Sequence, residues 1–322
     1  MRYVDLGGAR ISVIGLGAWQ FGSREWGYGD EYARREAAAI TRRALDLGIN
    51  LIDTAEIYGF GRSERIVGGA LAGRRDEVFL ATKLYPAFPV GPVVVRRANG
   101  SIRRLGVDRL NLYQVHALNP IISVRSTMRG MATLRTRGRI DHVGVSNFPL
   151  SAWQAAEDAL GGPVLSNQVR YSLAVRDPER ELLPWAQANG RLIIAYSPLA
   201  QGLLSGRYDG TNTPADVRAR NPLFLPTSMA DAEELLRALR EIAGSHAATP
   251  AQVALAWLLR RPNVVVIPGA RTVAQVEANA AAADLALDDD EDARLTEVSG
   301  RFRPAAGKAD VRRHRLRALV RR

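Results

Sequence analysis

Residues 49–83, INLIDTAEIYGFGRSERIVGGALAGRRDEVFLATK, contain one complete strand–helix–strand unit of the predicted fold. The apolar runs at 49–53 and 78–83 each predict a strand buried on both faces, because neither alternates with polar residues. Between them Ser63 is the predicted helix cap, and four apolar side chains follow at helical spacing: Ile66, Val67, Ala70 and Leu71. This order predicts two parallel strands joined by a crossover helix.

The same unit recurs along the chain. Further apolar runs cover 13–16, 110–116, 142–146, 164–168, 192–197 and 264–268. Helical spacing of apolar residues occurs at 30–47, 151–160, 178–189, 231–244 and 249–260. Eight strands alternating with helices over about 300 residues predict a closed (β/α)8 barrel, the TIM barrel, with its active site at the C-terminal ends of the strands. Residues 3–12, with Gly7-Gly8 between two short β-like runs, predict a β-hairpin ahead of the first barrel strand.

The C-terminal end differs from the rest in charge. No linker divides the chain before it, so we expect one barrel domain over 1–306 and a basic tail over 307–322. This tail holds seven cations and one anion, in a chain of net charge +11. It could be a solvated helix end, or it could bind nucleic acid or anionic lipid. Because charge alone does not define a partner, no specific nucleic-acid or membrane partner is predicted.

The composition excludes several kinds of chemistry. The 322 residues include no cysteine, which rules out disulfides, cysteine-ligated zinc, iron–sulfur clusters and thiol nucleophiles. With four histidines in the chain, a multi-histidine metal site is not expected, and no metal is predicted. No apolar run reaches the ~18 residues of a membrane span and no secretory signal is apparent, so a cytoplasmic location is expected. The oligomeric state is left open.

Polar residues end five successive predicted strands. In a (β/α)8 barrel these positions face the mouth of the active site. The alternative for each is that it caps the next helix or stabilises its own loop. Five such strand ends in a row favour a site. They are Asp53, Lys83, His116, Ser146-Asn147 and Asn167-Gln168.

Four residues near these strand ends suggest acid catalysis. A phenol is a weak acid at neutral pH, but a cation beside Tyr58 would favour its phenolate and lower its pKa. Asp53 could hold Lys83 as that cation, and His116 could orient a carbonyl oxygen that Tyr58 protonates. Lys83 is notable because 42 of the 44 cations are arginine, so this position indicates a need for a compact ammonium. Separately, Tyr58 could be a loop aromatic and His116 a hydrogen-bonded barrel histidine.

Six segments carry a resemblance to a known family: DTAEIYG (53–59), ATK (81–83), LYQVH (112–116), GVSNF (144–148), YSPL (196–199) and IPGAR (267–271). In this order and spacing, the chain from residue 2 to 300 resembles the aldo-keto reductases. The resemblance implies an NADP(H)-dependent reductase that converts an aldehyde, ketone or sugar-like carbonyl to an alcohol by hydride transfer. It also implies a catalytic tetrad of Asp53, Tyr58, Lys83 and His116, with Tyr58 as the general acid.

The resemblance further implies how the cofactor is held. Ser146, Asn147 and Gln168 would bind the nicotinamide carboxamide, and Tyr196 would stack on the ring, while Asn167 is expected to be structural. At the phosphate end, Gly269 would let the backbone approach, Arg271 would pair with a 2′-phosphate, and Gln275 and Asn279 would reach phosphate and adenine. The remaining expected cofactor contacts are Gly17, Trp19, Asp53, Ser197 and Leu199.

The phosphate-binding segment departs from the family pattern. Many relatives have Lys-Ser where this chain has Gly269-Ala270, Arg where it has Gln275, and Glu where it has Ala278. Arg271 is the one cation left to bind a 2′-phosphate, so NADP(H) is the predicted cofactor and NAD(H) the alternative.

Competing functional signals are weaker. The GLGAWQ segment at 15–20 has Gln where a dinucleotide-binding fingerprint needs its third glycine, and no helix is expected there. Some members of the superfamily are low-turnover nucleotide-sensing regulatory subunits. That alternative is disfavoured because a pure sensor does not need Lys83. A small-molecule carbonyl is therefore the predicted partner, and its pocket walls are expected to come from Trp19, Trp26, Tyr85, Phe148 and 205–230, with 209–230 as a lid.

Overall fold

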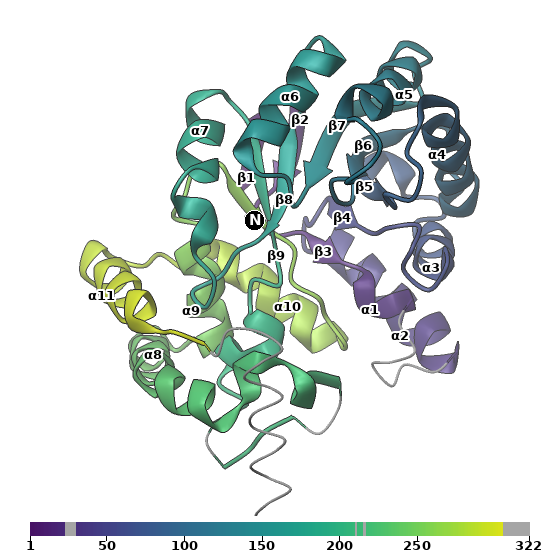
Figure 1. The fold of residues 1–322 in the computed structure, drawn as a ribbon. Coiled ribbons are helices and arrows are strands. Elements are labelled where there is room, and N and C mark those ends of the chain that lie inside the picture. Colours follow the sequence, from purple (N-terminus) through teal and green to yellow (C-terminus); the bar gives the residue numbers. More distant parts are fainter. Residues whose placement is uncertain (23–29, 210, 215–216, 305–322) are drawn as a thin grey trace, which may run out of the picture.

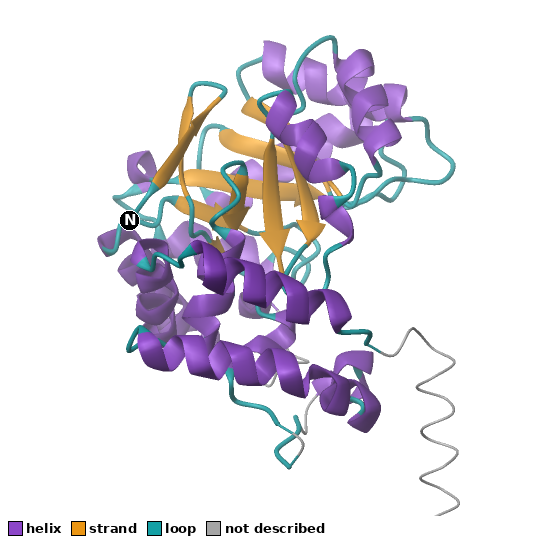
Figure 2. Cartoon of the chain, turned by 90° about the vertical axis from the view of Figure 1, so that its left-hand side faces the viewer, coloured by secondary structure: helices purple, strands orange, loops and turns teal. Residues whose placement is uncertain are grey.

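Eight parallel strands form the centre of the molecule, with helices around them (Figures 1 and 2). The computed structural model describes residues 1–22, 30–209, 211–214 and 217–304. The strands are β3 Leu16–Gly17, β4 Leu51–Asp53, β5 Phe79–Leu84, β6 Leu110–Val115, β7 Ile140–Ser146, β8 Ser166–Arg170, β9 Leu192–Tyr196 and β10 Val264–Val266. Each pairs with the next in chain order.

The first and last strands meet and close the barrel. Ile14 pairs with Val266, and Gly17 with Gly269, as isolated parallel bridges. Gly17 is needed at this seam because a Cβ on it would lie 2.7 Å from the carbonyl oxygen of Ile267. The predicted (β/α)8 barrel is confirmed.

The strands alternate with helices as expected. The α-helices are α1 Trp19–Gly22, α2 Asp30–Asp46, α3 Arg62–Ala70, α4 Gly91–Leu105, α5 Val124–Thr136, α6 Leu150–Leu160, α7 Leu182–Ala188, α8 Pro226–Ser245, α9 Pro250–Leu258, α10 Val273–Ala281 and α11 Asp289–Arg301. Short 3₁₀ helices lie at Arg75–Glu77, Asp177–Glu179, Ala200–Ser205, Val217–Arg220, Pro222–Phe224 and Ala282–Asp284. The expected hairpin pairs β1 Tyr3–Leu6 with β2 Ala9–Ser12, and Gly7 and Gly8 make its turn with positive φ angles.

Some local predictions were wrong. Ser63 does not cap α3, because the helix begins at Arg62 after Gly61, which has a φ of 82°. Ser63 is buried inside the helix, where its hydroxyl donates to the carbonyl of Ala18 at 2.7 Å and accepts from the Thr54 hydroxyl at 2.9 Å. It therefore stabilises the segments beside β4 instead of the helix end.

The first β/α unit and the predicted lid also differ from expectation. The first strand begins at Leu16, later than the predicted 13–16, and the short helix α1 follows it where no helix was expected. Of the predicted lid, residues 226–230 belong to the start of α8, while 210 and 215–216 lie outside the described residues. The tail at 307–322 lies outside them too, so its boundary at 306 stays a prediction.

The interior of the barrel has an apolar end and a polar end. Large apolar side chains fill the end where the strands begin, and the hairpin contributes one of them: Ile11, Leu51, Phe79, Leu112, Leu165, Leu192 and Val265. Inward positions recur every second residue along a strand, so the same strands carry inward polar side chains nearer their C-terminal ends. The apolar end therefore supports the floor of the candidate site.

Candidate active site

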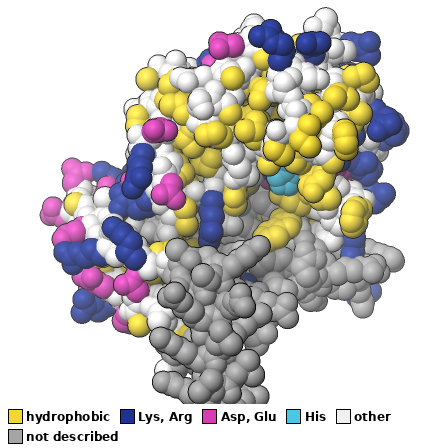
Figure 3. All heavy atoms as spheres, viewed as in Figure 1, with side chains coloured by type: hydrophobic (Ala, Val, Ile, Leu, Met, Phe, Trp, Pro, Cys, Tyr) yellow, Lys and Arg dark blue, Asp and Glu magenta, His cyan; other side chains and the backbone are white. Residues whose placement is uncertain are grey.

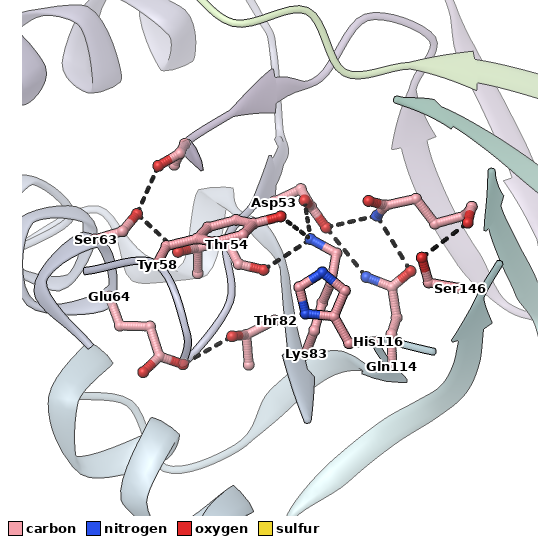
Figure 4. A network of polar contacts seen from close by, with 12 residues as sticks. Asp53, Thr54, Tyr58, Ser63, Glu64, Thr82, Lys83, Gln114, His116 and Ser146 are labelled. Atoms are coloured by element: carbon pink, nitrogen blue, oxygen red, sulfur yellow. Dashed lines mark hydrogen bonds and ion pairs between the residues drawn. The ribbon is translucent and has the colours of Figure 1, made fainter. Parts of the chain in front are cut away.

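The four predicted catalytic residues lie together at the C-terminal ends of neighbouring strands (Figure 4). Asp53 is the last residue of β4, Lys83 lies near the end of β5, and His116 directly follows β6. Tyr58 comes from the loop between β4 and α3, and its hydroxyl points toward the Lys83 ammonium. The structure brings all four residues into one cluster.

The loop that carries Tyr58 is fixed from two sides. Its Gly59 packs on α1, where a Cβ would lie 2.3 Å from the carbonyl oxygen of Gly22. On the other side Glu56 accepts the backbone N–H of Tyr85 at 2.6 Å and pairs with Arg97 at 2.9 Å. These contacts hold Tyr58 over the end of β5.

Lys83 is fully buried, and each proton of its ammonium has an acceptor. It donates to the carboxylate of Asp53, to the carbonyl of Thr54 at 3.0 Å and to the hydroxyl of Tyr58 at 3.3 Å. Burial lowers the pKa of Lys83, but the charge of Asp53 and the neighbouring Tyr58 oxygen outweigh burial and raise the pKa above its ordinary value. Lys83 is therefore a charged donor at neutral pH.

Tyr58 does not have the lowered pKa that the sequence predicted. Burial raises the pKa of its phenol, and the charge and hydrogen bond of Lys83 lower it only in part, so the pKa stays above its usual value. Lys83 does lower the pKa of Tyr58, as the sequence predicted, but burial raises that pKa by more. Tyr58 is a neutral phenol at neutral pH.

His116 is a neutral imidazole in this structure. Burial first, and then the charge of Lys83, lower the pKa of His116 to about 4. Its ring stands edge-on to Tyr58, with 5.8 Å between the ring centroids and 83° between the planes. Its buried Nδ1 finds no hydrogen-bond partner within the described part of the chain. A neutral imidazole carries one ring N–H, and because Nδ1 is buried, the nitrogen that can orient a ligand oxygen is Nε2.

The predicted carboxamide-binding residues adjoin this cluster. Ser146 donates its hydroxyl proton to the backbone carbonyl of Gln168 at 2.9 Å and accepts from the Asn147 amide at 3.1 Å. The hydroxyl of Tyr196 donates to the Asn147 Oδ1 at 3.0 Å. Asn147 has a φ of 57°, the left-handed region that asparagine tolerates better than most residues. Asn167, predicted to be structural, bonds the backbone of Phe148 through its side-chain amide at 2.8 Å.

One polar residue of the site was not singled out from the sequence. Gln114 is fully buried on β6, and its Nε2 donates to the Oδ2 of Asp53 at 3.1 Å. Gln168 donates to the same oxygen at 2.9 Å and to the Oε1 of Gln114 at 3.3 Å. The signal was available, because Gln114 is a polar residue two positions before His116, between Tyr113 and Val115 of the strand.

The predicted phosphate-binding residues lie in and just before α10: Gly269 and Arg271 precede the helix, Gln275 is in its first turn and Asn279 is near its end. Thr272 caps this helix, and the Gln275 side chain accepts the backbone N–H of Arg271 at 2.7 Å. Asn279 is buried and its amide approaches the carbonyl of Gly269 at 3.5 Å. A helix N-terminus with arginine and glutamine side chains is suited to an anion.

The other expected cofactor contacts are spread along the same face. Trp19 is 41% exposed, and its ring lies 6.5 Å from that of Tyr58, centroid to centroid. Ser197 follows β9 with a φ of 50°, and Leu199 is half-buried beyond it. Gly17 lies at the seam of the barrel, where a side chain would meet the backbone of Ile267.

The predicted pocket walls are partly corrected. Tyr85 is 41% exposed at the mouth, whereas Phe148 is buried in the main hydrophobic core and cannot line a pocket. Trp26 lies outside the described residues. The loops after β4 to β6 expose four apolar residues that were not predicted: Phe60, Phe88, Leu118 and Ile121. Figure 3 shows hydrophobic side chains gathered around a histidine on one face of the molecule.

Metal and membrane features were searched in the same residues. Among the described ranges, no group of three or more His, Cys, Asp or Glu side chains is arranged to hold a metal ion. No helix there is long and apolar enough to cross a membrane.

The fold and the site define a TIM-barrel enzyme with a buried Asp–Lys pair beside a phenol and an imidazole. A family model described as the aldo/keto reductase family matches residues 13–299. The chain is 50% identical to an uncharacterized oxidoreductase of Mycobacterium tuberculosis, over 95% of each chain. It is 35% identical to the methylglyoxal reductase YeaE of Escherichia coli, over 90% of this chain and 91% of that one.

Solved structures agree. An aldo/keto reductase from Klebsiella pneumoniae, in complex with NADP and acetate, superposes with a TM-score of 0.76 at 33% identity, covering 95% of this chain and 97% of that one. This protein therefore belongs to the aldo/keto reductase family. The prediction of an NAD(P)H-dependent oxidoreductase of that family is confirmed.

Proposed function

We propose that this protein reduces aldehyde, ketone or sugar-like carbonyls with NADP(H), and that Tyr58 is the general acid. The observation that carries the proposal is the Tyr58 hydroxyl, which accepts a hydrogen bond at 3.3 Å from the buried ammonium of Lys83, whose other acceptors are Asp53 and Thr54. A phenol that stays protonated until its proton is needed, next to a fixed cation, suits the protonation of a carbonyl oxygen.

The residues of the tetrad divide the work. NADPH, when bound, supplies the hydride to the carbonyl carbon. Tyr58 gives its proton to the carbonyl oxygen, and the phenolate left behind is stabilised by the Lys83 ammonium at 3.3 Å. Asp53 keeps Lys83 charged and in place. Neutral His116 can donate one hydrogen bond to the same oxygen, which orients the carbonyl toward Tyr58.

The residues present fit the cofactor. The Nε2 of Gln168 is committed to Asp53 and Gln114, and its Oε1 forms no hydrogen bond to the rest of the described chain. An unused amide oxygen beside Ser146 and Asn147 is an acceptor for the carboxamide NH₂ group. At the other end, the start of α10 with Arg271 and Gln275 suits the phosphates. Solved relatives that contain NADP or NADPH agree with the predicted cofactor.

The mouth of the site supports a substrate with an apolar body. Phe60, Phe88 and Ile121 are 86%, 71% and 86% exposed on three neighbouring loops. Both phenylalanines have positive φ angles, 52° and 46°, an uncommon conformation for bulky residues that is often found at functional loops. The methylglyoxal reductase relative is named for a small carbonyl compound, which supports a carbonyl substrate but not an apolar body.

The test is a panel of aldehydes and ketones, with small polar and larger apolar members, supplied with NADPH or NADH while the absorbance of the reduced nicotinamide is followed. We expect turnover with NADPH and higher kcat/KM for the apolar members. Tight nucleotide binding without turnover of any carbonyl would contradict the proposal and support a nucleotide-sensing role.

Cofactor preference can be tested at Arg271. Arg271→Ala should weaken NADPH binding about ten- to a hundredfold, because a charge-assisted contact to the 2′-phosphate is lost. NADH lacks that phosphate, so its affinity should change little. Equal losses for the two cofactors would mean that Arg271 is structural.

A further inference from the structure

A closed triangle of hydrogen bonds links Gln114 of β6, Gln168 of β8 and Asp53 of β4 (Figure 4 shows part of it). Gln114 donates to the Oδ2 of Asp53, Gln168 donates to the same oxygen, and Gln168 also donates to the Oε1 of Gln114. Turning the Gln168 amide over would set its oxygen against two acceptor oxygens. Turning the Gln114 amide over would set oxygen against oxygen at Asp53 and N–H against N–H at Gln168, so the triangle fixes both amide orientations. The three residues are at most 2% exposed.

The backbone is built to let Gln114 reach across the barrel. The strand β7 lies between β6 and β8, and its Gly144 is paired with both Gln114 and Ser166. A Cβ on Gly144 would lie 2.9 Å from the Cγ of Gln114 and 2.7 Å from the Oγ of Ser166. Gly144 therefore leaves the space through which the Gln114 side chain passes over β7 to Gln168.

We propose that Gln114 is a positioning residue that holds the Gln168 amide with its oxygen toward the nicotinamide carboxamide. The inference rests on the proposed function, in which Gln168 binds that carboxamide. Because Gln114 and Gln168 share the Oδ2 of Asp53, whose Oδ1 pairs with Lys83, the same triangle joins the nicotinamide site to the Lys83–Tyr58 pair. Without Gln114, Gln168 keeps only its hydrogen bond to Asp53, so its amide is held less tightly.

The first test compares two nucleotides that differ in the nicotinamide. Gln114→Met keeps the length of the side chain and removes both of its hydrogen bonds. We expect the Kd for NADPH to rise about two- to tenfold, the effect of losing an ordinary hydrogen bond. The Kd for adenosine 2′,5′-bisphosphate, which lacks nicotinamide, should not change. Both are measured by titration of tryptophan fluorescence.

A matched control lies in the same part of the barrel. Ser166 is fully buried, and its Oγ has no hydrogen-bond partner in the described ranges. Ser166→Ala therefore removes a buried polar atom next to Gly144 without breaking the triangle. It should leave both dissociation constants at their wild-type values.

A second variant tests the geometry by protonation. A protonated carboxyl in Gln114→Glu can donate to Asp53 and accept from Gln168, as the amide does, whereas the ionised form places a negative charge beside Asp53. The titratable side chains of the network around this position are Asp53, Lys83, Tyr58 and His116. We expect the ratio of variant to wild-type Kd for NADPH to lie near one at low pH and to increase as pH rises. This variant carries the test if Gln114→Met does not fold.

The outcomes separate the inference from the proposed function. If wild type binds both nucleotides and Gln114→Met binds NADPH equally well, or loses both nucleotides equally, the positioning role is wrong while the reductase proposal stands. A pH-independent Kd ratio for Gln114→Glu would contradict the inference in the same way. A wild-type protein that binds neither nucleotide would overturn the proposed function and this inference together.

Discussion

The same strands form both ends of the barrel interior, but one end is packed with apolar side chains and the other holds the polar side chains of the candidate site. In β9, Leu192 packs in the apolar end and Tyr196 stands in the polar end four residues later. In β4, Leu51 and Asp53 divide in the same way over two residues. At the apolar end the side chains interlock, whereas at the polar end each charge and amide is held by specific partners.

The difference teaches why a buried charge can persist here. A buried ammonium is costly unless it is paired and hydrogen-bonded. Lys83 satisfies that condition with three acceptors, and Asp53 satisfies it with Lys83 and two amides. The apolar end supplies the rigid support, so the polar end can hold a reactive arrangement without filling its space with core side chains. Substitutions at the two ends should therefore separate activity from stability.

The largest effect is expected from Tyr58→Phe at the polar end. The variant keeps the ring and loses the acidic hydroxyl, so steady-state carbonyl reduction should fall by about 10²–10⁴. The Kd for NADPH and the melting temperature should stay close to wild type. A variant that reduces carbonyls at the parent rate would show that Tyr58 is not the proton donor.

The opposite result is expected from Leu192→Ala at the apolar end. Removing a fully buried leucine should lower the free energy of unfolding by about 2–5 kcal/mol, measured by urea denaturation. Under conditions in which the variant is folded, kcat should match wild type. A large loss of kcat with normal stability would mean that the apolar end takes part in function more directly.

A smaller effect is expected from Lys83→Arg, which keeps the charge. The planar guanidinium is bulkier than the ammonium and cannot match three acceptors arranged around one nitrogen. We expect kcat to fall at least about tenfold, with nucleotide still bound. Lys308→Arg, the other lysine of the chain, is the control and should be silent. If both substitutions were harmless, a point charge would not be needed beside Tyr58.

Much of this arrangement could be predicted from the sequence, because it depends on the order of apolar and polar residues along the chain and on the spacing of the strands and helices. The apolar runs predict the strands, the polar residues at the ends of five successive strands predict the face that holds the site, and the rare lysine at position 83 indicates the site itself. The hairpin followed from Gly7-Gly8 for the same local reason.

The errors concern features that only three-dimensional packing decides. Phe148 looked like a pocket wall, but Asn167 bonds its backbone and its ring enters the core. Ser63 had the sequence pattern of a helix cap, but its hydroxyl accepts a hydrogen bond from Thr54 and donates one to the carbonyl of Ala18. The pKa of Tyr58 is set by burial against Lys83, a balance that spacing along the chain does not contain.

The most direct test of the account is the pH dependence of a single turnover of carbonyl reduction, from about pH 5 to about pH 11, in wild type and Tyr58→Phe. Tyr58 must be protonated to act, so the rate should fall as pH rises through its pKa. Burial holds that pKa above the ordinary value of about 10, so the fall should come only at alkaline pH. His116 stays neutral over this range because its pKa is lowered to about 4, so no acidic limb is expected. We predict a level rate with one alkaline limb that disappears in Tyr58→Phe. A limb near neutral pH, or an unchanged alkaline limb in Tyr58→Phe, would contradict the account.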